Sequence, residues 1–196
     1  MSVVYKGHFI QYKFIIPETT KHSSYNYQKL FRALYGYTQN VTKSNGKTYK
    51  YHRKGILSDI PYIRPGKNCV IIPPKSFAPL DAFFKTGKNP THFWKTKGNW
   101  KAVFYMDEKN LEESQVIAAL KELITRMFQP GYDEVQTPDL NSLAARAAAG
   151  ESVSADKAKL AVSEAEKVVN QPWFKDVYSK DAGLKKFYEN YKALKG

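Results

Sequence analysis

The sequence predicts an α+β fold: a mainly antiparallel sheet with helices packed on one face, followed by a small helical C-terminal region. Two observations support this class. Strand-like and helix-like segments follow each other irregularly over residues 1–130, with neighbouring strands in succession, which favours hairpins over parallel βαβ units. After a Pro-Gly pair the composition then turns to alanine, lysine and glutamate. We therefore expect a basic domain at 1–130, a linker at 131–138 and a helical region at 139–196.

The first two predicted elements are a strand and a helix. Apolar residues alternate along 3–16 until a proline ends the pattern, which predicts a long strand. Tyrosine, leucine and phenylalanine then recur at helical spacing, between a capping serine (Ser23 or Ser24) and Gly36. This spacing, with its start and stop residues, predicts a helix whose aromatic side chains pack in the core.

The remaining elements are predicted from shorter patterns. Residues 69–72 form an apolar run ended by two prolines, typical of a buried strand, and residues 101–106 predict another strand. A short helix is expected around residues 80–85. The most regular helix follows the second strand, where Asn110 and Glu113 have the spacing of a capping box. Three further helical segments are expected at 138–149, 154–170 and 172–194.

The functional prediction rests on residues 37–54. Asn45 and Gly46 readily adopt the positive φ angles of a type I′ turn, which predicts a tight hairpin centred there. Beyond the turn, cations occupy both alternating faces, so neither face can be buried without stranding charge. We therefore predict a projecting basic arm that binds phosphates and stacks bases, rather than a hairpin that is basic only for solubility. Its predicted contact residues are Lys43, Lys47, Tyr49, Lys50, Tyr51, Arg53 and Lys54.

A second predicted contact region lies in loops that also mix cations with aromatic residues. The loop 85–101 interleaves lysines with Phe and Trp, an arrangement suited to single-stranded nucleic acid. Trp100 fits this loop or the core equally well. The additional predicted contact residues are Arg64, Lys67, Lys88, Trp94, Lys95 and Lys97.

The charge distribution agrees with a polyanionic partner. The chain of 196 residues has a formal net charge of +13. Residues 1–106 contain 18 Lys and Arg against three acidic residues, whereas residues 107–196 contain 13 basic and 15 acidic ones. All of the excess positive charge thus lies in the first half. We expect the partner to be RNA or DNA rather than anionic lipid, because the sequence has no basic amphipathic helix of the kind that lies on bilayers.

Signatures of catalysis are mostly missing from the sequence. Phosphate-binding, nucleophile-elbow and zinc-protease motifs are absent, and the basic half has too few carboxylates for a two-metal nuclease. The alternative that stays open is a metal-independent ribonuclease, in which His8, His22 or His52 would act as general acid and base. A third hypothesis is a structural subunit that coats nucleic acid in a ribonucleoprotein or virion.

The sequence also bears on compartment and partners. The single cysteine, Cys69, allows no disulfide within the chain and no paired-cysteine metal site. No apolar segment reaches the length of a signal peptide or a membrane span. We therefore expect a cytoplasmic protein, or one associated with a nucleoid or virion, with no cofactor, no metal and no membrane partner. The helical region 139–196 is the expected surface for a protein partner or for self-association.

Overall fold

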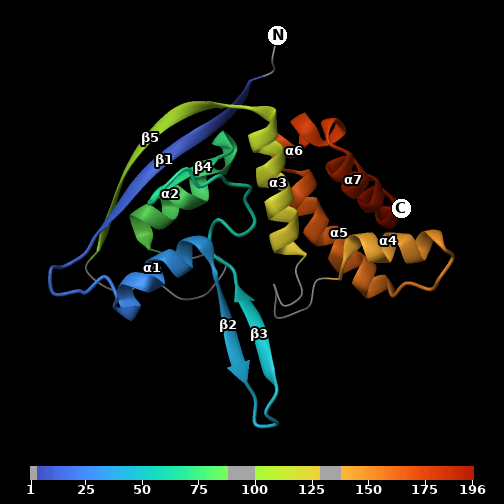
Figure 1. Ribbon diagram of the computed structural model, residues 1–196, viewed down its shortest axis with the longest axis horizontal. Helices are drawn as coiled ribbons and strands as arrows, with labels where there is room; N and C mark the ends of the chain where they lie inside the picture. The colour runs from blue at the N-terminus through green and yellow to red at the C-terminus, as the bar shows by residue number, and fades with distance from the viewer. Residues whose placement is uncertain (1–3, 88–99, 129–137) are drawn as a thin grey trace.

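The computed structural model describes residues 4–87, 100–128 and 138–196, and it confirms the α+β class with antiparallel sheets (Figure 1). The strands are β1 (Tyr5–Ile15), β2 (Tyr37–Thr42), β3 (Thr48–Arg53), β4 (Cys69–Ile72) and β5 (Lys101–Leu111). The helices are α1 (Tyr25–Tyr35), α2 (Phe77–Thr86), α3 (Glu113–Met127), α4 (Leu140–Ala148), α5 (Ala155–Val169), α6 (Pro172–Val177) and α7 (Ala182–Lys195). Two short 3-10 turns, η1 (Pro74–Ser76) and η2 (Tyr178–Lys180), precede α2 and α7.

The central sheet has the order β4-β1-β5, with both pairings antiparallel. β1 pairs with β5 along its whole length, from Tyr5 opposite Leu111 to Ile15 opposite Lys101. β5 is therefore longer than the strand predicted from its apolar residues. Its polar second half remains extended because it pairs with the first half of β1, although its side chains stay exposed.

Alternation along β1 divides the core between the two faces of the sheet. Ile10, Tyr12 and Phe14 point to one face and pack in a cluster with α1 and α2. Tyr5 points to the other face, where it joins a cluster built mainly by α3 and the C-terminal helices. α1 and α2 thus cover one face as expected, and α3 to α7 cover part of the opposite face.

Trp173 on α6 fixes the C-terminal helices to the sheet. Its side chain is 2 % exposed, and its Nε1 donates a hydrogen bond of 2.9 Å to the carbonyl of Lys6 on β1. Gly7 makes room for this contact, since a Cβ there would lie 2.6 Å from Ile71 and 3.4 Å from Trp173. Residues before and after the 131–138 segment therefore contribute to one buried cluster.

The helix ends agree with most of the predicted caps. Ser24 caps α1 by accepting from the amide of Tyr27, and Gly36 follows with a φ of 76°. The predicted capping box of Asn110 and Glu113 is wrong: β5 extends through that position, and Glu112 forms the box with Gln115 instead. The predicted helix 172–194 is also interrupted, because Asp181 caps a new helix by accepting from the amide of Leu184.

Candidate nucleic-acid interface

β2 and β3 form a two-stranded hairpin that we call the arm, residues 37–53. The strands pair from Tyr37 opposite Arg53 to Thr42 opposite Thr48, and they belong to no larger sheet in the described residues. Figure 1 shows the arm extending away from the central sheet and the helices. Almost every residue from 38 to 50 is exposed. The prediction of a projecting hairpin agrees with this geometry.

The predicted turn type is wrong. Gly46 has a φ of 74°, but Asn45 does not have a positive φ, so the type I′ turn is absent. The amide of Gly46 donates to the carbonyl of Lys43, and the amide of Lys43 donates to Lys47. This is a turn with one left-handed glycine, the usual form of a three-residue hairpin loop. Asn45 stabilises it differently, because its Oδ1 accepts from the amide of Lys47.

Close backbone contacts attach the arm to α1. The amides of Ile56 and Leu57, directly after the arm, donate at 2.9 Å to the carbonyls of Ala33 and Leu34 in the last turn of α1. Gly55 permits the approach, since a Cβ there would lie 2.2 Å from the amide nitrogen of Gly36. Carbonyls that a helix end leaves without internal partners thus hold the base of the arm.

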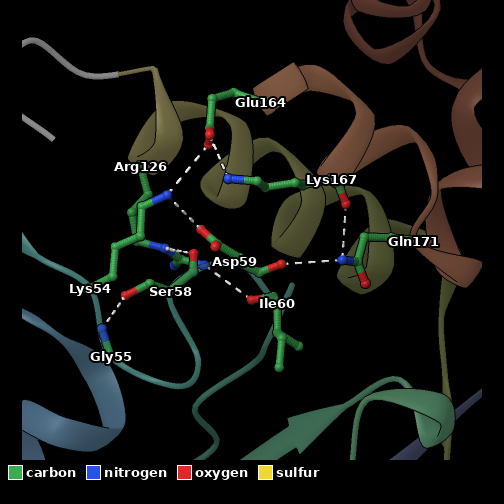
Figure 2. Close-up of polar contacts among 9 residues, drawn as sticks. All are labelled: Lys54, Gly55, Ser58, Asp59, Ile60, Arg126, Glu164, Lys167 and Gln171. Atoms are coloured by element: carbon green, nitrogen blue, oxygen red, sulfur yellow. Dashed lines mark hydrogen bonds and ion pairs between the residues drawn. The ribbon is translucent and has the colours of Figure 1, made fainter. Parts of the chain in front are cut away.

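A polar network holds the same base against α3 and α5 (Figure 2). Lys54 lies 3.3 Å from Asp59 and 3.4 Å from Glu164, and only 13 % of its side chain is exposed. Arg126 on α3 donates to the carbonyls of Ser58 and Ile60 at 3.2 and 3.1 Å. Lys54, predicted from the sequence to contact phosphate, is therefore engaged inside the protein, and we place it outside the interface.

One face of the arm carries alternating cations and tyrosines. The Nζ of Lys43 lies 4.6 Å from the ring centre of Tyr49, and the rings of Tyr49 and Tyr51 are 6.5 Å apart. The guanidinium of Arg53 lies 5.9 Å from the ring of Tyr51. Tyr49 is 37 % exposed, which leaves ring surface available to a ligand. Four of the predicted contact residues thus share one face.

This face continues onto α1 through residues that the sequence prediction missed. Tyr37 shares the face because it is the cross-strand partner of Arg53. The guanidinium of Arg32 lies 4.9 Å from the ring of Tyr37 and 5.5 Å from that of Tyr25, and Lys29 lies 5.9 Å from Tyr25. The i, i+4 and i+7 spacing of Tyr25, Lys29 and Arg32 places them on one face of the helix, and it could have identified them from the sequence. We call the set the cation–tyrosine stripe: Tyr25, Lys29, Arg32, Tyr37, Lys43, Tyr49, Tyr51 and Arg53.

The opposite face of the arm is polar rather than aromatic. Thr42 and Thr48 hydrogen-bond through their hydroxyls at 3.0 Å, and Thr38 lies 3.5 Å from the Nδ1 of His52. Lys50 shares this face, and both Lys50 and Lys47 at the turn are exposed. Lys50 thus brings positive charge to the second face, so the arm is cationic on both sides.

The arm region has no carboxylate of its own. The segment 19–58 contains eight Lys and Arg residues and no Asp or Glu. The nearest acidic residue in sequence, Asp59, lies at the base of the arm next to Lys54. The cations along the stripe lie over aromatic rings, and such a contact does not neutralise a positive charge.

Arg64 and Lys67 lie outside the arm, in the segment between β3 and β4. Arg64 lies 4.5 Å from the ring of Tyr35, whose hydroxyl is 2.9 Å from that of Tyr12. Burial raises the pKa of both tyrosines, so they are neutral at pH 7. Lys67 lines a cavity of about 660 Å³. The other lining residues are Gln11, Tyr12, Lys13, Phe14, His22, Tyr27, Asn68, Val103, Phe104 and Tyr105, with no carboxylate among them.

The three histidines have different surroundings. His8 on β1 contacts the ring of Phe77, His22 stacks on Tyr27 with ring centres 4.6 Å apart, and His52 lies on the arm. His22 lines the cavity, whereas neither His8 nor His52 does. Among the described residues, no group of three or more His, Cys, Asp or Glu residues could hold a metal ion.

Part of the second predicted contact region cannot be placed. Lys88, Trp94, Lys95 and Lys97 lie outside the described residues. Trp100, for which loop and core were both expected, packs against Phe14 and Phe83 with ring centres 5.7 Å from each.

Comparison of the chain with protein-family models, with curated proteins and with solved structures found no match. Among the described residues, no helix is long and apolar enough to cross a membrane.

Proposed function

We propose that the protein binds single-stranded nucleic acid through the arm, without cleaving it. The observation that carries the proposal is the cation–tyrosine stripe, in which tyrosine rings alternate with cations in a segment, 19–58, that contains no Asp or Glu. Cations neutralise phosphates and release counterions, and aromatic faces stack on bases of any sequence. Both requirements are met on one surface.

The rigid base of the arm supports the same proposal. The contacts with α1 and the network around Lys54 fix where the strands leave the body of the protein. A ligand on the arm therefore does not have to order the strands on binding, which lowers the entropic cost of association. Single-stranded nucleic acid is favoured over a duplex because stacking on tyrosine needs bases that are not already stacked on both sides.

The test is a binding titration of the full chain against single- and double-stranded RNA and DNA between 50 and 200 mM salt. A variant with Lys43, Lys47 and Lys50 changed to Ala should bind single strands roughly tenfold or more weakly at low salt, with a salt slope smaller by about 2. The matched control changes Lys157, Lys159 and Lys186, three exposed lysines of the helical region, to Ala. It removes the same charge, so equal weakening by both variants would contradict a role specific to the arm.

The same titrations distinguish binding from cleavage. We expect intact nucleic acid after incubation, with or without divalent metal. Cleavage that disappears in His8→Ala, His22→Ala or His52→Ala would replace the proposal by the ribonuclease hypothesis.

A further inference from the structure

One edge of the central sheet is a long strand that the other described residues leave unpaired. β5 is an end strand, and in the part of the chain that the structure describes it pairs only with β1. Figure 1 shows it along the rim of the molecule. Residues 103–110 are all exposed, and the pairing with β1 has no break that would mark a bulge. Natural edge strands are usually short, bulged or interrupted by proline, because their free N–H and C=O groups recruit other strands. β5 has 11 residues, no bulge and no proline, and its charged residues lie at position 101 and from 107 to 109, outside the apolar run.

The side chains of β5 form an apolar centre with opposite charges at its two ends. Val103, Phe104, Tyr105 and Met106 are 49, 37, 61 and 40 % exposed. Lys101 precedes this run, and Asp107, which also lies 3.6 Å from the exposed Lys109 of its own strand, follows it. In an antiparallel pair of two such strands, the positive end of each strand lies opposite the negative end of the other.

Symmetry restricts how two copies of β5 can pair. In an antiparallel pair around a two-fold axis perpendicular to the sheet, opposite residues must point to the same face. Because side chains alternate, the two residue numbers of each pair must add to an even number. Each possible pairing therefore has one residue at its centre, opposite the same residue of the partner subunit. Only a few choices of this central residue leave a long stretch of β5 paired.

One centre pairs every apolar side chain of the run with another apolar side chain, and each charged one with an opposite charge. With Phe104 opposite Phe104 of the partner subunit, Lys101 faces Asp107 of the partner subunit and Val103 faces Tyr105 of the partner subunit. A centre at Tyr105 instead places Lys101 against Lys109 of the partner subunit. A centre at Val103 shortens the pairing to residues 101–105, and a centre at Met106 places Phe104 and Tyr105 against Glu108 and Asp107 of the partner subunit.

We propose that two copies of the chain associate through antiparallel pairing of their β5 strands, centred on Phe104. The two three-stranded sheets then become one continuous sheet. Main-chain hydrogen bonds and the apolar centre hold the copies together, and the two Lys101–Asp107 pairs select the register. The inference is independent of the proposed nucleic-acid binding.

Charge reversal at the two ends provides the test. Lys101 and Asp107 of one chain are six residues apart along an extended strand, about 20 Å, and do not interact with each other. Lys101→Asp places two like-charged pairs in the dimer, and so does Asp107→Lys. Each variant alone should raise the dimer dissociation constant roughly tenfold or more. An equal mixture of the two variants forms a heterodimer in which both pairs are again opposite in charge, so association should return.

Sedimentation velocity over a concentration series at low salt measures these effects, on protein freed of nucleic acid by nuclease treatment and a high-salt wash. Lys13→Asp is the matched control: Lys13 is exposed on the same face, but on the central strand β1. It should leave the dimer unchanged within about threefold. A wild-type chain that stays monomeric up to about 0.5 mM, or a mixture no more associated than the separate variants, would overturn the proposal.

Discussion

Lysine–tyrosine pairs occur in two regions of this molecule and have different surroundings in each. On the C-terminal helix α7, Lys195 lies 5.3 Å from the ring centre of Tyr191, and its Nζ also donates to Glu166 at 2.7 Å. On the arm, Lys43 lies 4.6 Å from Tyr49, in a segment without any carboxylate. Lys195 is thus paired with a carboxylate of the protein itself, whereas the positive charge of Lys43 can be neutralised by a ligand.

The pKa values follow the same division. Hydrogen bonds from Lys195 and Tyr191 lower the pKa of Glu166, and Glu166 in turn raises the pKa of Lys195. Lys180, Glu113 and Tyr5 form a similar set, in which the lysine lowers the pKa of Glu113. Composition alone therefore does not separate structural from ligand-binding lysines. The presence of a carboxylate, often distant in sequence, does.

The largest effect that we expect is a loss of fold stability when Trp173 is removed. Trp173→Ala removes a buried ring and leaves the carbonyl of Lys6 without its side-chain donor. We expect the free energy of unfolding to fall by about 3–5 kcal/mol. Urea unfolding followed by far-UV circular dichroism, rather than by tryptophan fluorescence, measures this loss. A loss below about 1 kcal/mol would contradict the docking role.

A smaller loss is expected when Lys54 is compared with Lys50. Lys54→Ala leaves the buried Glu164 with Lys167 as its remaining ion-pair partner and should cost about 1–3 kcal/mol of stability. Lys50→Ala removes an exposed cation and should change stability by less than about 0.5 kcal/mol. Binding should show the reverse order. If Lys50→Ala destabilises the fold as much as Lys54→Ala, the two sets of cations are not distinct.

Acid should weaken the C-terminal helices while the arm stays unaffected. The pKa values of Glu113, Glu166 and Asp181 are lowered in the folded protein by Lys180, Lys195 and Lys121. Their contribution is thus fully present above their unfolded pKa values and is lost as pH falls through the folded ones. The melting temperature should stay level from pH 7 to about 5 and decline below about 4.5. A decline that begins near pH 6.5 would indicate histidine titration instead.

The sequence predicted the elements that depend on local patterns. Alternation along residues 3–16, the serine cap and glycine stop of α1, and the period of α3 all correspond to observed elements. The arm was predictable for the same reason, because cations on both alternating faces exclude burial. Its turn type was not, since Asn45 hydrogen-bonds the amide of Lys47 instead of adopting a positive φ.

What the sequence could not show were contacts between distant residues. Lys54 belongs to the same basic segment as Lys50, and only the fold brings Glu164, 110 positions later, next to it. The length of β5 had the same cause, because its polar half is held extended by pairing with β1 and not by its own side chains. The α1 part of the stripe was missed because Tyr25, Lys29 and Arg32 lie outside the apolar spacing from which that helix was predicted.

The smallest stability change that we expect comes from removing a single tyrosine hydroxyl, at Tyr191 or at Tyr49. The hydroxyl of Tyr191 donates to Glu166 and accepts from Lys195, and its side chain is mostly buried. Tyr191→Phe should therefore cost about 1 kcal/mol of stability. Tyr49→Phe should cost almost nothing, because Tyr49 lies exposed on the arm and its ring contact with Lys43 is kept.

Binding then separates the ring of Tyr49 from its hydroxyl. If the ring stacks on a base, Tyr49→Phe keeps affinity for single-stranded nucleic acid, whereas Tyr49→Ala loses about 1–3 kcal/mol of binding free energy without a change in melting temperature. Tyr191→Phe, which alters the paired tyrosine, should leave affinity unchanged. Equal affinity of Tyr49→Ala and the wild type would mean that the stripe supplies only charge, because a ring that can be removed without loss does not stack.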